Sequence, residues 1–233
     1  EEGASGFSLV PNNNAQRTLI LGRAGTEEPV LFTVREDFSL GSSSNAWGPV
    51  NVNADWNVLV ANGKTLNVYG ALNSSGRTIT VGGEGFSGTL VLNNAANAPM
   101  TAEWVITSGS TVRCMNNSAL GSGLVTLDGG TLDFNSQTIG STITLNMSGT
   151  GTLQNVTVDG AILSYTSSSG NDGITASNTT WTSGKIDIGR LLQGFSAEGS
   201  NTVDLGAELG EGFSVLGLET GQYRIEGSVL TIE

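Results

Sequence analysis

A short strand pattern recurs along this chain of 233 residues, and it limits the folds that the chain can adopt. The pattern is Thr, then Leu or Ile, then any residue, then an apolar residue. In an extended strand, alternation places the second and fourth residues on one face and the Thr on the other. Copies of the pattern begin at Thr18, Thr65, Thr78, Thr89, Thr131 and Thr142.

The segments between the copies are rich in Gly and Asn, as in YGALNSSG and GGEGFSG. These residue types accept a positive φ, which a sharp corner of the chain requires. Regular repetition of short strands and sharp corners is typical of a solenoid. We therefore expect an all-β fold, a parallel β-helix with roughly 20–25 residues in each coil. A β-sandwich is the alternative, because the Asn-Gly and Asp-Gly pairs also suit hairpin turns.

The stretch SALGSGLVTLDGGTLDF illustrates the expected coil. Val125 and Leu127 are predicted to point inward from one strand, and Leu132 and Phe134 from the next. The Gly-Gly pair between them is predicted to form the corner. The interior would then be a stack of aliphatic and aromatic side chains.

Charge and residue usage exclude several classes of function. The chain has 9 basic and 21 acidic residues, a formal net charge of −12, so we expect no nucleic-acid partner. Histidine is absent, and Cys114 is the single cysteine, which we interpret as a buried, inert thiol. We accordingly predict no metal and no cofactor. No apolar run reaches the length of a membrane span, so this segment is not expected to insert into a membrane.

The two ends of the chain differ from its middle. Residues 1–16 are polar and irregular and are predicted to form an N-terminal cap of the rod. Residues 17–190 would form the parallel β-helix, and residues 191–233 would form C-terminal coils or a cap. The last segments, Tyr223–Ile225 and Val229–Ile232, are expected to pair as closing strands.

Residues 116–134 resemble the passenger-associated repeat of bacterial autotransporters. That repeat reads as a small residue, Ala-Leu-Gly-x-Gly, a short β run, and Gly-Gly-Thr-Leu. The resemblance is weaker over residues 57–165. The matching positions are Ser118, Ala119, Leu120, Gly121, Gly123, Val125, Leu127, Gly129, Gly130, Thr131 and Leu132.

This resemblance implies a right-handed parallel β-helix that is secreted or exported to the surface of the bacterial outer membrane. The translocator domain and the serine protease domain of autotransporters have no counterpart in residues 1–233, so the resemblance implies a segment or a cleavage product. It implies an adhesin, another binding module or a structural module. The expected partner is a host or cell-surface glycan or protein.

Parallel β-helices also carry carbohydrate-active enzymes, so a polysaccharide lyase or glycosidase is the alternative function. Such enzymes need carboxylates that converge on one cleft. The acidic residues between 37 and 185 are spread out, and we interpret Asp128 and Asp133 as structural. No catalytic residue is therefore assigned, and a non-enzymatic function is preferred.

Two groups of residues are candidates for ligand binding. Trp47 and Trp56 flank a polar segment, and an exposed Trp can stack on a sugar ring, although a place in the core is the alternative. Lys185, Asp187 and Arg190 lie close together in the segment SGKIDIGR, where a strand places Lys185 and Asp187 on one face. They are candidates for contact with a sugar acid, with a surface ion pair as the alternative.

Overall fold

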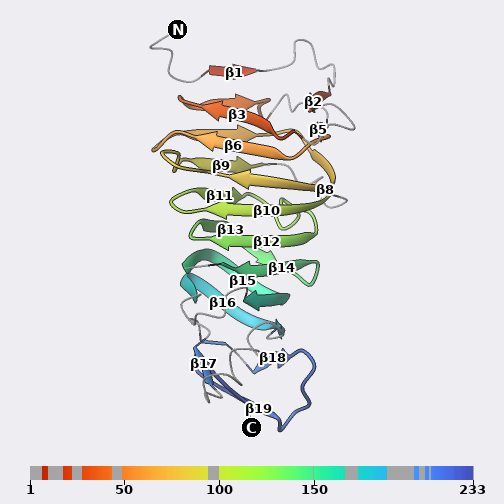
Figure 1. The fold of residues 1–233 in the computed structure, drawn as a ribbon, viewed down its shortest axis with the longest axis vertical. Coiled ribbons are helices and arrows are strands. Elements are labelled where there is room, and N and C mark those ends of the chain that lie inside the picture. Colours follow the sequence, from red (N-terminus) through yellow and green to blue (C-terminus); the bar gives the residue numbers. More distant parts are fainter. Residues whose placement is uncertain are drawn as a thin grey trace.

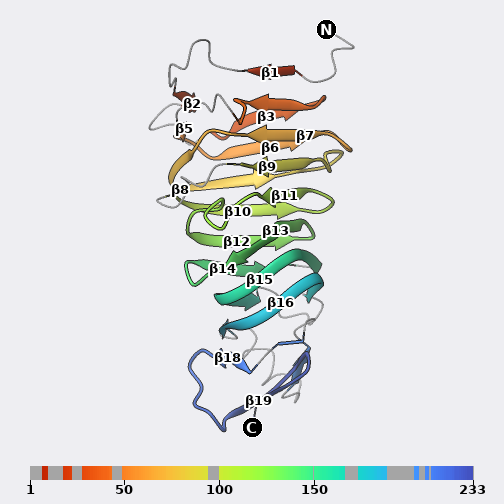
Figure 2. The same cartoon turned by 180° about the vertical axis from the view of Figure 1, so that it is seen from behind.

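The computed structural model describes residues 7–9, 18–22, 28–43, 49–93, 100–148, 150–165, 173–187, 202–204, 208–209 and 211–232. These residues form an elongated stack of β-strands, with β1 at one end and β19 at the other (Figures 1 and 2). No α-helix occurs among them, and hence none that is long and apolar enough to cross a membrane.

Parallel strands are stacked along the long axis of the molecule in three runs. One run contains β1 (Phe7–Leu9), β4 (Phe38–Leu40), β7 (Thr65–Val68), β9 (Thr89–Leu92), β11 (Thr111–Cys114), β13 (Thr131–Ile139), β15 (Thr150–Tyr165) and β16 (Gly173–Asp187). A second contains β3 (Val30–Val34), β6 (Trp56–Val60), β8 (Leu72–Val81), β10 (Thr101–Thr107), β12 (Gly123–Asp128), β14 (Ile143–Met147), later parts of β15 and β16, and β18 (Gly212–Val215).

The third run is short and contains β2 (Leu19–Leu21), β5 (Val50–Val52) and the beginning of β8. Within each run, neighbouring strands pair in parallel orientation from one coil to the next, and the first and last strands pair on one side only. This pairing confirms the predicted parallel β-helix. It excludes the alternative β-sandwich, whose facing sheets are typically antiparallel.

Side chains that point inward are stacked in columns through the coils. One column follows the register of the second run and is almost entirely buried. Since every coil buries its apolar residues against the coils above and below, the stack has one continuous core. The members of this column are Val30, Trp56, Ile79, Trp104, Val125, Leu145, Leu163, Ile186 and Val215.

Threonines form a matching column on the outer side of the first run. Six of them are in register from coil to coil, which confirms the predicted alternation of Thr outside and Leu or Val inside. The column consists of Thr65, Thr89, Thr111, Thr131, Thr152 and Thr175. The residues that follow the first five of them, such as Leu66, Leu90 and Leu132, are fully buried, whereas Ala176, which follows Thr175, is exposed.

A polar ladder stabilises one corner of the lower coils. Asn135, Asn155 and Asn178 have φ values of 49°, 52° and 50°, in the left-handed region that Asn tolerates. The Asn155 side chain donates to Asp133 Oδ1 at 3.0 Å, and the Asn178 side chain donates to Asn155 Oδ1 at 3.0 Å. Arg113 of the preceding coil donates from Nε to Asp133 Oδ2 at 2.9 Å. Side-chain hydrogen bonds thus connect four successive coils.

The ends of the stack differ in topology. β1, the described part of residues 1–16, pairs in parallel with β4 as the first strand of the stack. Within residues 191–233, β18 continues the parallel stack, whereas β17 (Thr202–Asp204), β20 (Val229–Ile232) and β19 (Tyr223–Glu226) form an antiparallel sheet. The expected pairing of the last two strands is confirmed. The domain boundaries at residues 16 and 190 stay predictions.

Candidate ligand-binding site

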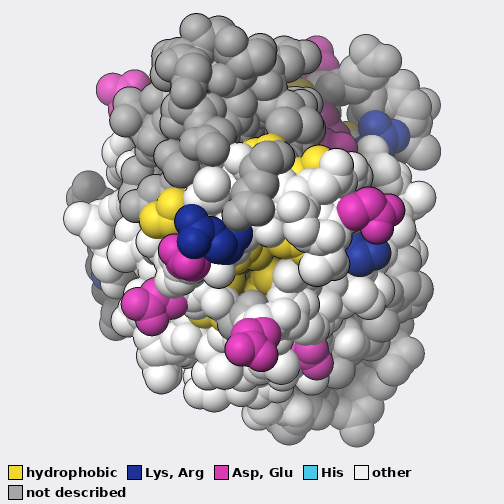
Figure 3. Space-filling view, turned by 90° about the horizontal axis from the view of Figure 1, so that it is seen from below, with side chains coloured by type: hydrophobic (Ala, Val, Ile, Leu, Met, Phe, Trp, Pro, Cys, Tyr) yellow, Lys and Arg dark blue, Asp and Glu magenta, His cyan; other side chains and the backbone are white. Residues whose placement is uncertain are grey.

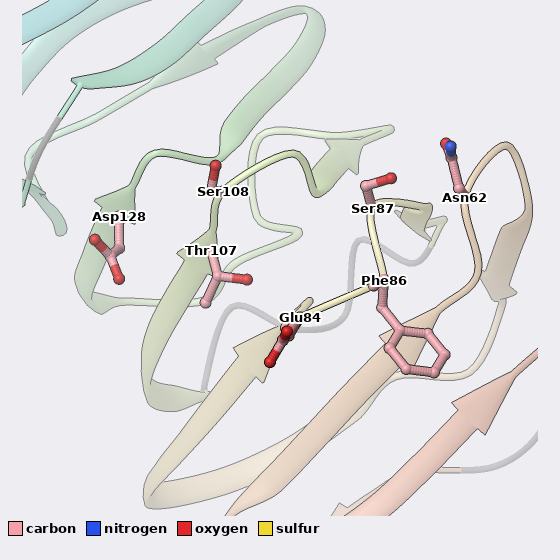
Figure 4. A pocket seen from close by; sticks show the side chains of 9 residues that line it. Asn62, Glu84, Phe86, Ser87, Thr107, Ser108 and Asp128 are labelled. Atoms are coloured by element: carbon pink, nitrogen blue, oxygen red, sulfur yellow. The ribbon is translucent and has the colours of Figure 1, made fainter.

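A surface pocket of about 500 Å³ runs along one corner of four consecutive coils. The corners follow β6, β8, β10 and β12, so the pocket is parallel to the axis of the stack (Figure 4). Each corner contributes to the pocket wall. The lining residues are Asn62, Gly83, Glu84, Gly85, Phe86, Ser87, Thr107, Ser108 and Asp128.

The corner between β8 and β9 is longer than its neighbours and forms one wall of the pocket. Its sequence is GGEGFSG, whereas the next two corners consist of SGS and GG. The Phe86 amide donates to the Gly83 carbonyl at 2.9 Å, which closes a small turn. Gly82 has a φ of +96°, and a Cβ atom there would lie 1.8 Å from Ser110 Oγ. Only glycine allows the chain to leave the stack at this point.

Hydroxyl groups of the following coil hold this long corner in place. Ser110 is 1% exposed, and its Oγ donates to the Phe86 carbonyl at 3.1 Å. Thr107 Oγ1 donates to the Val81 carbonyl at 3.1 Å, and the Gly82 amide donates to the Val58 carbonyl at 2.9 Å. Because these bonds reach both neighbouring coils, the pocket wall is held in place by the stack itself.

Most side chains in the pocket are polar, and its two carboxylates are unpaired within the described residues. Glu84 and Asp128 are exposed and have no hydrogen-bond or ion-pair partner within the described part of the chain. Asn62 adds an amide, Ser87 and Ser108 add hydroxyls, and Phe86 adds a half-buried ring. Figure 4 shows Thr107 between Glu84 and Asp128. Amides, hydroxyls and carboxylates can all hydrogen-bond a ligand rich in hydroxyl groups.

The nearest basic residue in the sequence is already paired. Lys64 lies in the first of the four corners, and its ammonium group forms an ion pair with Glu36. The hydrogen bond from Lys64 to Glu36, together with the charge of Glu36, raises the pKa of Lys64. The described residues that line the pocket include no Lys or Arg, and their carboxylates give the pocket a negative charge.

Comparison with known proteins identifies no relative. Neither protein-family models, nor curated proteins, nor solved structures give a significant match to this chain.

The structure places Trp56 in the core. Its residue exposure is 0%, and its ring packs edge-on against Phe32 with 6.2 Å between the ring centroids. A sugar cannot stack on a ring in this position. Trp56 is therefore a core residue, which was the alternative interpretation of its sequence position. Its inward orientation follows from its register with Ile79 and Trp104. Trp47, the other candidate, lies outside the described residues.

Lys185 and Asp187 lie on the outer face of β16, on either side of the fully buried Ile186. This arrangement agrees with the predicted alternation. Arg190 lies outside the described residues, and neither Lys185 nor Asp187 lines the pocket. The proposed contact of these three residues with a sugar acid therefore stays a prediction.

Glu84 is not among the site residues predicted from the sequence, and Asp128 is predicted to be structural. The sequence feature that could have indicated Glu84 is the length of its corner, which exceeds that of the following corners. Asp128 could not be recognised as a pocket residue from the sequence, because its place in the pocket depends on the alignment of the coils. Asp133 has the structural role that the sequence predicts, because its side chain is 3% exposed and is paired with Arg113.

A second hollow of about 270 Å³ lies at the C-terminal end of the stack. It is lined by Leu209, Glu211, Phe213, Tyr223 and Ile225. Hydrophobic side chains are visible at this end of the molecule, among acidic and basic ones (Figure 3). The hollow is smaller than the corner pocket and is lined by fewer polar side chains, so it is the poorer candidate for a carbohydrate.

Metal and thiol chemistry find no support in the described regions. No group of three or more His, Cys, Asp and Glu side chains there could hold a metal ion. Cys114 is fully buried, and burial, together with the nearby charge of Asp133, raises the pKa of its thiol.

Proposed function

We propose that this protein is a binding module whose corner pocket holds a carbohydrate. The observation that carries the proposal is the pocket itself, to which four consecutive coils contribute hydroxyl, amide, carboxylate and aromatic groups. A sugar presents hydroxyls around an apolar ring face. These features complement the polar side chains and the half-buried ring of Phe86.

The rigidity of the stack supports a binding function. The pocket wall is fixed by backbone and hydroxyl hydrogen bonds to adjacent coils, so little conformational entropy is lost when a ligand binds. The volume of about 500 Å³ lies within the range of small-molecule sites.

A glycan array with the intact chain tests this function, followed by titration of the glycans that bind. Phe86→Ala removes the ring, and Asn62→Ala removes the amide; each is expected to weaken binding about fivefold or more. Thr152→Ala, in the threonine column outside the pocket, is the matched control and should bind as the unmodified protein does. Absence of any carbohydrate ligand would leave a structural spacer as the function.

A carbohydrate-active enzyme is the second candidate, because Glu84 and Asp128 line the same pocket. Hydrolysis of glycosidic bonds uses two carboxylates, one as a general acid and one as a base or nucleophile. If the protein is a glycosidase, incubation with the oligosaccharides that it binds will release new reducing ends. Glu84→Gln and Asp128→Asn would then abolish turnover, whereas a binding module gives no product.

We also propose that the protein is secreted or displayed on a bacterial surface, where its partner is a glycan or a protein. The similarity of residues 116–134 to the passenger-associated repeat supports this location. Antibody labelling of intact cells tests it, and labelling that requires permeabilised cells would contradict it.

A further inference from the structure

The corner pocket concentrates negative charge without a described counter-charge. Glu84 and Asp128 come from different coils and lie on either side of Thr107 (Figure 4). The lining includes no Lys or Arg, and Lys64 is paired with Glu36. The whole chain has a formal net charge of −12, so no distant excess of basic residues offsets the two carboxylates.

We propose that the pocket selects carbohydrates that bear protonated amines, with Glu84 and Asp128 as the residues that recognise the charge. This inference rests on the proposed carbohydrate-binding function and specifies its ligand class. An ammonium group has three hydrogen-bond donors and no acceptor, whereas an ionised carboxylate only accepts. The charge-assisted hydrogen bonds between them are stronger than neutral ones. Glycans that contain uronate or sialate groups would be repelled.

The shape of the pocket suits a short linear chain of sugars. Adjacent coils of a β-stack are about 4.8 Å apart, so the corners from Asn62 to Asp128 span on the order of 14 Å. The ring of Phe86 lies on the same wall as Glu84 and offers an apolar surface to a sugar ring. An oligosaccharide along this line would place successive units beside successive corners and bring amines near both carboxylates.

Oligomers of glucosamine and of N-acetylglucosamine are suitable probes, because they share a backbone and differ in the charged amine. Calorimetric titration of the full chain is expected to show at least tenfold tighter binding of the glucosamine oligomer. An oligomer of galacturonate should not bind. Affinity for the glucosamine oligomer should fall as salt is added, since exposed charges are screened.

Substitutions separate the pocket from the general negative charge of the protein. Glu84→Gln and Asp128→Asn should each weaken binding of the glucosamine oligomer roughly three- to tenfold, without weakening binding of the acetylated oligomer. Glu103→Gln removes an exposed charge outside the pocket and should leave both affinities unchanged.

The outcomes distinguish the two proposals. Equal binding of the two oligomers, or equal effects of the Glu84 and Glu103 substitutions, would overturn the preference for amines and leave carbohydrate binding in place. Binding of none of the oligomers, with no ligand on the glycan array, would overturn both. The salt dependence of the unmodified protein tests the inference independently of how well any variant folds.

Discussion

Arg113 donates from Nε to Asp133 Oδ2 at 2.9 Å, which connects two adjacent coils at the outer surface of the stack. The Arg113 side chain is 46% exposed, whereas that of Asp133 is 3% exposed. Asp133 also accepts hydrogen bonds from the Asn135 amide and the Asn155 side chain. The carboxylate is therefore the centre of the polar ladder, and the guanidinium covers it.

Removal of this carboxylate is expected to destabilise the fold. Asp133→Ala should lower the free energy of unfolding by about 2–3 kcal/mol, because its donors lose a charged acceptor. Arg113→Ala should cost about 1 kcal/mol or less, since the exposed guanidinium is hydrated in either state. Urea unfolding of both variants measures the difference, and an equal cost for the two would contradict the central role of Asp133.

The stability of the protein should also depend on the ionisation of Asp133. Burial alone would raise the pKa of this carboxyl, but hydrogen bonds, first among them the one from Asn155, hold the pKa below its ordinary value of 3.8. A lowered folded-state pKa means that the stabilisation is complete above the unfolded-state pKa. It is lost as the pH falls through the folded-state pKa.

Asp133→Asn isolates this dependence. The difference in unfolding free energy between the unmodified protein and the variant should be constant above about pH 5 and shrink below about pH 4. Urea titrations across this range measure it. A difference that grows as the pH falls would show that the sign is wrong.

Gly82 and Gly85 provide a matched test of the long corner. Both have positive φ values, +96° and +77°, but a Cβ atom at Gly82 would collide with Ser110, whereas the space at Gly85 is open. Gly82→Ala should cost about 2–4 kcal/mol, and Gly85→Ala about 1 kcal/mol from backbone strain alone. Thermal unfolding compares the two, and a similar cost at both positions would mean that the corner relaxes.

Trp56 and Trp104, which are both buried, differ in their hydrogen bonds. Trp104 Nε1 donates to the Leu120 carbonyl at 3.1 Å, whereas Trp56 Nε1 has no partner among the described residues. Trp104→Phe leaves the carbonyl unpaired, which costs about 1–3 kcal/mol beyond lost packing. Trp56→Phe removes a similar volume but breaks no hydrogen bond. Chemical denaturation should therefore show a smaller loss of unfolding free energy for Trp56→Phe than for Trp104→Phe. The reverse order would indicate a partner of Trp56 outside the described residues.

Cys114 should be unreactive in the folded protein. The thiol is fully buried, and its raised pKa keeps it protonated. A maleimide reagent at neutral pH is expected to label it only after unfolding in urea. Rapid labelling of the native protein would show that the coil around β11 opens readily.

The stacked core could be predicted from the sequence because strand alternation and burial depend on residue types close together in the chain. Thr131, Leu132 and Phe134 took up the expected orientations. Trp56 illustrates the limit of this reasoning: its polar neighbours suggested a loop, yet the alternation through Val50 and Val52 brings it into the core.

The pocket could not be predicted because it depends on which corners lie next to one another. Glu84 and Asp128 are separated by two coils of unequal length, and only the register of β8, β10 and β12 aligns them. A pattern of apolar residues fixes the inside of each coil but not the length of its outward corner. Ligand-binding groups on a solenoid are therefore harder to recognise than its core.

The long corner between β8 and β9 is attached to the stack through a few bonds at its base, and the ladders above and below it continue undisturbed. Under the proposed binding function, insertions at such a point would alter what the rod recognises while the folding of the rod stays the same. Scaffold and specificity are thus encoded in different stretches of the chain. For a protein with the proposed binding function, a change in the length of a single turn would be enough to give new binding properties.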